Sequence, residues 1–195
     1  MNAKSDGILS AIAASGLEKC LLKMNRASSG KWELAGARVF TGRIPEAIKL
    51  RNPEGGPSSA VQINVDNSPR FAAALVFGSG DINHISRCFV NDDLSRASGI
   101  ERFEEVMLVE IGNILLNALI NSLLNSLKRS AVPSVPMHVS GGTEAITDGL
   151  GAFMDLNLNY RIIALAVNIR RDGHSSRAEI LAILPEELAA DLEPA

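Results

Sequence analysis

The sequence predicts an α+β fold in which helices pack against an antiparallel sheet, and three observations support this prediction. Hydrophobic residues make up 46% of the 195 residues and aromatic residues only 4%, so the core is built mainly from Leu, Ile, Val and Ala. These residues are divided between long stretches with helical spacing and short continuous runs that are typical of buried strands. The strand-like runs also come in pairs joined by short polar turns, which favours hairpins.

The first half of the chain is expected to contain a helix, a strand, a loop, a hairpin and a short helix. Apolar residues at helical spacing indicate the first helix, and prolines and glycines indicate the loop. The turn Asp66-Asn67-Ser68-Pro69 joins the two hairpin strands. In chain order, the expected elements are residues 6–25, 32–40, 50–59, 60–65 with 71–77, and 82–90.

The second half repeats this order of elements. Its long helix is expected to end at Lys128 and Arg129, whose charges suit a helix C-terminus, and Pro133 and Pro136 prevent any further helix. The expected elements are a helix at 99–129, a strand from 137–139, a turn at 141–142, a hairpin of 160–169 and 178–184, and a helix at 185–192. The repeated order predicts an internal duplication within one domain, 1–195, with halves of about 1–95 and 96–195 that share one sheet.

Composition excludes several classes of function. The formal net charge of −3 leaves no basic excess to neutralise a phosphate backbone, so nucleic acid is not an expected partner. The longest apolar runs, such as 71–77, are far shorter than the ~18 residues of a membrane span, and no secretory start is present. We therefore expect a cytoplasmic protein in which Cys20 and Cys88 are reduced and act as small buried hydrophobes.

Searches for familiar catalytic and cofactor motifs narrow the field further. His84, His138 and His174 lie far apart in the sequence, without cysteine or carboxylate at ligand spacing, so no metal site is expected. The sequence has no phosphate-binding loop, no nucleophile elbow and no cysteine-centred catalytic motif. Gly78-Ser79-Gly80 is interpreted as a turn that ends a strand.

The long helix places one glutamate and three asparagines on one narrow face. With Val106 as the origin and ~100° per residue, Glu110, Asn113, Asn117 and Asn121 lie at about 40°, 340°, 20° and 60°. The opposite side is the expected core-facing stripe, formed by Leu108, Ile111, Ile114, Leu115, Ala118, Leu119 and Leu123. Asparagine is a mediocre helix former, so three of them need a reason. Spacing alone favours a solvated face or a helix–helix contact.

Glu110-Ile111-Gly112-Asn113, followed by Pro136 after 22 intervening residues, resembles the ExxN…P signature of the CheC/CheX/FliY family of chemotaxis phosphatases. The order of elements extends the resemblance over roughly 60–184, beginning with Phe77-Gly78-Ser79-Gly80 ahead of the short helix. The resemblance implies a CheC-like fold. In that fold, two pseudo-repeated halves of helix plus antiparallel strands share one sheet, and the long motif helix packs on it.

The family resemblance also implies a function, namely removal of phosphate from the phospho-aspartate of a CheY-like response regulator in chemotaxis or related two-component signalling. Asn113 would position the attacking water, and Glu110 would pair with a lysine of the regulator. Asn117 and Asn121 would contact the regulator at the rim, and Pro136 would fix the entry into the following strand. Mg²⁺ would be carried by the regulator, so the protein would need no cofactor of its own.

Two departures from the family pattern keep other interpretations open. Val106 stands at a partner-binding position where the family usually has Ser or Asp, and the first helix has no second ExxN around Ser10 to Ala13, which implies one site. One alternative is a catalytically weak adaptor that binds a response regulator, a CheD-like deamidase or a flagellar switch component without turnover. Another is an unrelated α+β structural protein with incidental asparagines. A second copy of the chain is a further candidate partner, and it would exclude docking if it covered Glu110 and Asn113.

Overall fold

The computed structural model describes residues 3–51, 56–67, 69–89 and 100–192, and these form six helices and six strands. The first half contributes α1 (Ala3–Ala27), β1 (Lys31–Gly42), α2 (Ile44–Arg51), β2 (Ser58–Val65), β3 (Phe71–Gly78) and α3 (Ser79–Arg87). The second half contributes α4 (Ile100–Ser126), β4 (Met137–Gly141), α5 (Thr143–Gly151), β5 (Tyr160–Arg171), β6 (His174–Leu184) and α6 (Glu186–Asp191). The α+β prediction is therefore confirmed, and the element order αβαββα occurs twice.

The sequence-based elements differ from the structure mainly in two short helices, α2 and α5, which were not predicted. Each carries only a few apolar anchors, such as Ile44 with Ile48 and Ile146 with Leu150, and is stabilised by packing rather than by length. The long helix ends at Ser126 rather than Arg129, because the chain turns at Lys128, whose φ is 53°. The predicted helix ends at Val90 and Gly99 lie outside the described residues, as does part of the predicted loop, 52–55.

All strands belong to one antiparallel sheet with the order β1-β5-β6-β3-β2-β4. Exchanging the two halves reverses this order onto itself, with β3 and β6 paired at the centre. The first strand of each half pairs with the hairpin of the other half, β1 with β5 and β4 with β2. Neither half therefore completes its sheet alone, and the two halves interlock.

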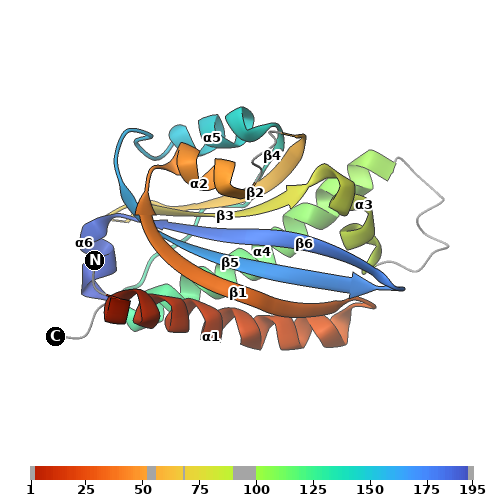
Figure 1. Ribbon diagram of the computed structural model, residues 1–195, viewed down its shortest axis with the longest axis horizontal. Coiled ribbons are helices and arrows are strands. Elements are labelled where there is room, and N and C mark those ends of the chain that lie inside the picture. Colours follow the sequence, from red (N-terminus) through yellow and green to blue (C-terminus); the bar gives the residue numbers. More distant parts are fainter. Residues whose placement is uncertain (1–2, 52–55, 68, 90–99, 193–195) are drawn as a thin grey trace.

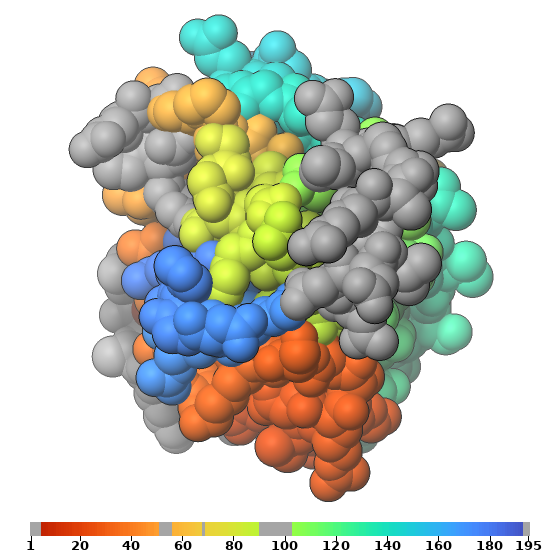
Figure 2. All heavy atoms as spheres, turned by 90° about the vertical axis from the view of Figure 1, so that its right-hand side faces the viewer, coloured from red at the N-terminus to blue at the C-terminus, as the bar shows by residue number. Residues whose placement is uncertain are grey.

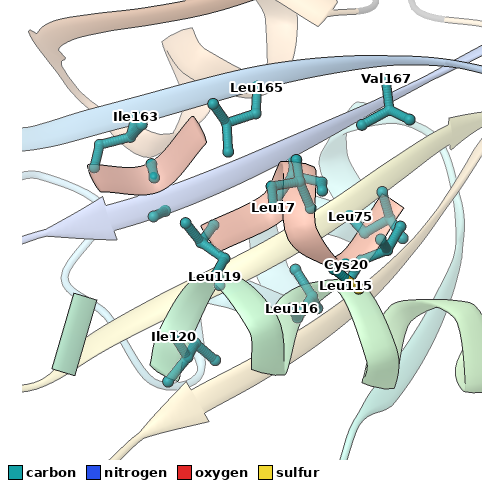
Figure 3. Close-up of a cluster of buried hydrophobic side chains, with 14 of the residues drawn as sticks. Leu17, Cys20, Leu75, Leu115, Leu116, Leu119, Ile120, Ile163, Leu165 and Val167 are labelled. Carbon is teal, nitrogen blue, oxygen red and sulfur yellow. The ribbon is translucent and has the colours of Figure 1, made fainter. Parts of the chain in front are cut away.

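Helices cover both faces of the sheet, so the molecule has three layers (Figure 1). α1 and α4 lie on one face, where Leu17 of α1 and Leu115 and Leu119 of α4 meet Ile163 and Leu165 of β5 (Figure 3). α2 and α5 lie on the other face and bury a smaller cluster against the alanine-rich strands. This arrangement makes α4 a structural element of the core with one free side.

The two helices of the larger layer run antiparallel and pack closely. Ser122 of α4 donates a hydrogen bond of 2.8 Å from Oγ to the carbonyl of Ile12, and the Cys20 thiol faces the carbonyl of Ile114. A Cβ on Gly16 would lie 2.4 Å from the Cβ of Ser122, so only glycine permits this approach. Cys20 and Cys88 are free and buried, and burial raises the pKa of both thiols, which confirms their expected role as small core residues.

At one end of the sheet, α3 of the first half lies against the β5–β6 turn of the second half (Figure 2). Nδ1 of His84 and Oγ of Ser176 are 2.7 Å apart, and the Arg171 guanidinium donates to the carbonyl of Arg87. These contacts add a second connection between the halves beyond the shared sheet.

Candidate functional site

The candidate site is the exposed face of α4, which the described residues leave uncovered. The opposite side of the helix is buried against the sheet and α1, as predicted for Leu108, Ile111, Leu115, Leu119 and Leu123. On the exposed face, Glu110 and Asn121 are exposed, and Asn113 and Asn117 are half-buried. The helical spacing therefore brought the predicted polar residues together on one open surface.

The expected core stripe was wrong at Ile114, whose side chain is 45% exposed. Ile114 lies about 80° from Val106 at ~100° per residue, which puts it at the border of the polar face. Leu116 and Ile120 are fully buried in its place. After α4 the chain folds back beside β2, where Val65 and Pro133 form an isolated β-bridge.

Gly112 lies between Glu110 and Asn113 and allows α4 to approach β2. A Cβ at this position would be 2.5 Å from Cγ1 and 2.6 Å from Cβ of Val61, well inside van der Waals contact. Glycine inside a helix costs about 1 kcal/mol relative to alanine, so its presence reflects this close approach. The sequence analysis did not assign Gly112 a role. A lone glycine within a helical pattern can indicate close packing, and this signal could have identified it.

Asn113 and Asn117 are joined by hydrogen bonds along the helix. The Nδ2 group of Asn117 donates to Oδ1 of Asn113 at 2.7 Å and to the backbone carbonyl of Asn113 at 2.8 Å. Residues four apart are neighbours on a helix surface, which makes this contact possible. The two amides therefore form one unit, a relationship that the spacing predicted only as a shared face.

Exposed apolar side chains flank the polar residues. Val106, one turn before Glu110, is 53% exposed, and Ile114, one turn after it, is 45% exposed. A carboxylate and amides set among exposed aliphatic groups form the mixed surface that is typical of protein contacts. This face is open in the described part of the chain.

Pro136 immediately precedes β4 and is half-buried. Two residues earlier, the backbone N–H of Ser134 donates to the carbonyl of Asn64 at 2.8 Å, which holds this segment against the end of β2. Two residues after Pro136, Nδ1 of His138 lies 3.4 Å from the carboxylate of Glu105 on α4. Pro136 thus lies where the chain enters the edge strand that borders α4.

Other features of the described residues bear on the chemistry of the site. Within the described ranges, no three His, Cys, Asp or Glu side chains are grouped so that they could hold a metal ion. Hollows of about 450 and 430 Å³ are lined by other residues, of β1, β5 and β6 and of α3 with the β5–β6 turn. Around Ser10 to Ala13, where a second site was not expected, Ala13 is fully buried in the core.

Among the described residues, α4 has one stretch, Phe103–Ser126, that is long and apolar enough to cross a membrane. The same length and composition occur in core helices of other proteins. Here the apolar side of α4 packs on the sheet, and the exposed side carries Glu110 and the asparagines. Its position is that of a core helix.

No protein-family model and no curated protein matches the sequence. Solved structures do match. FliY from Thermotoga maritima has a TM-score of 0.70 at 9% identity, covering 98% of this chain and 95% of that chain. FliM in the FliM–SpeE complex from H. pylori has a TM-score of 0.64 at 11% identity, covering 98% and 96%. The chemotaxis protein CheX from Vibrio vulnificus has a TM-score of 0.55 at 16% identity, covering 88% and 99%.

The chain therefore has the fold shared by FliY, FliM and CheX, and the CheC-like fold that the resemblance implied is confirmed. In the FliM–SpeE complex, a protein of this fold binds another protein.

Proposed function

We propose that the protein is a phosphatase that hydrolyses the phospho-aspartate of a CheY-like response regulator in the cytoplasm. The observation that carries the proposal is that Glu110 and Asn113 lie one turn apart on the open face of α4, between exposed Val106 and Ile114. This pair belongs to the ExxN…P pattern, and the fold around it is the CheC-like fold that the pattern implies. We assign the site to chemotaxis or a related two-component pathway.

The residues suit the needs of phosphoryl transfer. Water attacks the phosphorus, and the bond between phosphorus and the aspartyl oxygen breaks. The aspartate leaves as a carboxylate, and the water oxygen with both of its protons ends on inorganic phosphate. Such reactions depend on positioning and charge stabilisation rather than on covalent chemistry by the protein. The Asn113 amide offers both donors and an acceptor to hold the water in line, and the Glu110 carboxylate can pair with a lysine of the regulator. Mg²⁺ held by the regulator would supply charge neutralisation at the phosphoryl group.

A second candidate function is an adaptor that binds its partner without turnover. Val106 favours it, because this exposed position is apolar where the family usually has Ser or Asp. The fold is also that of FliM, which binds SpeE in the solved complex. The partners to be considered are a response regulator, a CheD-like deamidase, a flagellar switch component and a second copy of the chain.

The two functions are separated by measuring phosphate loss from phosphorylated CheY-like regulators of the same genome. We expect the native protein to accelerate this loss, and Asn113→Ala to reduce the acceleration about a hundredfold while binding survives. Glu110→Ala should weaken binding. Asn125→Ala is a matched control, since Asn125 is an exposed asparagine three turns further along α4. It should change neither quantity.

Binding without acceleration would contradict the phosphatase and support the adaptor. Val106→Asp or Val106→Ser would then be expected to restore turnover. If no regulator bound and none lost phosphate faster, both functions would be rejected.

A further inference from the structure

We infer that Asn117 is a positioning residue that holds the Asn113 amide in one orientation, instead of contacting the partner directly. This inference rests on the proposed function and deepens it, because it concerns how the same site is prepared for its substrate. It starts from the two hydrogen bonds between these residues.

The Asn117 amide already contacts Asn113 through its Nδ2 group. An asparagine Nδ2 carries two hydrogens, and in Asn117 one is donated to Oδ1 and the other to the backbone carbonyl of Asn113. The Nδ2 donors of Asn117 are thus directed to Asn113, and its Oδ1 is the group left to accept a hydrogen bond from a partner. A rim contact through Nδ2 would have to break a bond of 2.7 or 2.8 Å first. The structure therefore favours an internal role over the rim contact predicted from the sequence.

The bond from Asn117 restricts the orientation of the Asn113 amide. Rotation of the Asn113 amide by 180° would place its own donors against those of Asn117, so the bond selects one orientation. In that orientation Oδ1 keeps a second lone pair, and Nδ2, which donates to none of the described residues, offers both hydrogens to the attacking water and the phosphoryl oxygens. A donor on Oδ1 also polarises the amide and strengthens the hydrogen bonds that its Nδ2 donates. The cost of ordering Asn113 is met before the regulator binds.

Asn121 provides the matched comparison. It lies one further turn along the same face of α4 and is exposed, and its side chain makes no hydrogen bond to the described residues. Loss of the Asn121 side chain removes a polar group from the same surface without affecting Asn113. A difference between the two positions therefore reports on the bond to Asn113 and not on the polarity of the face.

The kinetic test compares hydrolysis by variants at saturating phosphorylated regulator. Asn117→Ala should lower kcat about two- to tenfold, the range set by the side-chain freedom that Asn113 regains, with an unchanged Kd for the regulator. Asn117→Asp should lose as much, since a carboxylate cannot donate to Oδ1, whereas Asn117→Gln should recover part of the rate. Asn121→Ala, at a predicted rim contact, should leave kcat unchanged and act only on Kd, and Asn125→Ala should change neither value. Adding Asn117→Ala to Asn113→Ala should cause no further loss.

The inference is overturned if Asn117→Ala raises Kd and leaves kcat unchanged, which is the behaviour of a rim contact. It is also overturned if Asn117→Asp keeps the full rate. If the native protein itself fails to accelerate phosphate loss, the proposed function fails. The hydrogen bond between Asn117 and Asn113 can still be tested by NMR, which requires no enzymatic activity. The side-chain amide protons of Asn117 should exchange with solvent more slowly than those of Asn121 in NMR spectra, and Asn113→Ala should reduce this difference. Equal exchange rates in the native protein would reject the inference.

Discussion

Replacing Gly112 with alanine tests whether the close approach of α4 to β2 is required by the fold. The new Cβ would lie 2.5 Å from Cγ1 of Val61, and the neighbouring atoms belong to a buried strand, so α4 or β2 must move. Overpacking of this kind costs about 1–3 kcal/mol, whereas the better helix propensity of alanine returns about 1 kcal/mol. We expect Gly112→Ala to lower the free energy of unfolding by up to about 2 kcal/mol.

A double-mutant cycle isolates the contact from the helix propensity. Val61→Ala removes the two γ carbons and should cost about 1.6 kcal/mol at ~0.8 kcal/mol per buried carbon, with an additional cavity cost. In the double variant, the methyl group introduced by Gly112→Ala occupies part of the vacated space. The combined loss should therefore be smaller than the sum of the single losses by about 1–3 kcal/mol.

Urea unfolding followed by circular dichroism measures all four proteins, and Gly7→Ala is the matched control. Gly7 also lies within a helix, α1, but a Cβ there would meet nothing within 4 Å. Gly7→Ala should therefore stabilise the protein by up to about 1 kcal/mol. The reasoning is refuted if Gly112→Ala is as favourable as Gly7→Ala, or if the cycle is additive within about 0.5 kcal/mol.

Three further changes have expected outcomes. Asn25→Ala removes two hydrogen bonds with the backbone of Trp32, of 2.6 and 3.0 Å. It should lower the free energy of unfolding by about 1–3 kcal/mol, which lowers Tm by about 2–4 °C per kcal/mol. An unchanged Tm would contradict this expectation. Leu119→Ala should leave a cavity in the core and cost about 2–5 kcal/mol, measured as a lower urea midpoint with unchanged slope. Hydrogen bonds from the Arg43 side chain and then from its backbone lower the pKa of Glu46 below its usual 4.5. Its contribution to stability is therefore present above this pH and is lost as pH falls through the folded-state pKa. Glu46→Gln should weaken the pH dependence of stability in this acidic range, and an unchanged acid titration would reject that cause.

Much of the fold could be predicted because its long elements carry periodic patterns. The stretches that became α1, α4 and the two hairpins are long or strongly apolar, and each was predicted at nearly its observed place. α2 and α5 were missed, since eight or nine residues with few apolar positions do not show a helical period clearly. Their stability comes from burying Ile48 and Leu150 against the second face of the sheet, a surface that exists only after the strands have paired.

The candidate site was also predicted in part from local sequence patterns, and the rest depended on tertiary packing. Helical geometry alone placed Glu110, Asn113, Asn117 and Asn121 on one face, because residues three and four apart must share a side. It misassigned Ile114, since a residue at the border of a face is covered or exposed according to what packs beside it. Here Ile120 is fully buried and Ile114 is exposed.

The sequence by itself determined the class of fold, the repeated order of elements and the polar face of α4, because these follow from local periodicity and turn residues. Only the tertiary structure decided how the halves interlock, which side of α4 stays open, and why Gly112 must be small opposite Val61. It also decided that the Asn117 amide bonds to Asn113 rather than facing solvent. These features depend on distances and rotamers within a packed molecule, and local sequence patterns do not encode them individually.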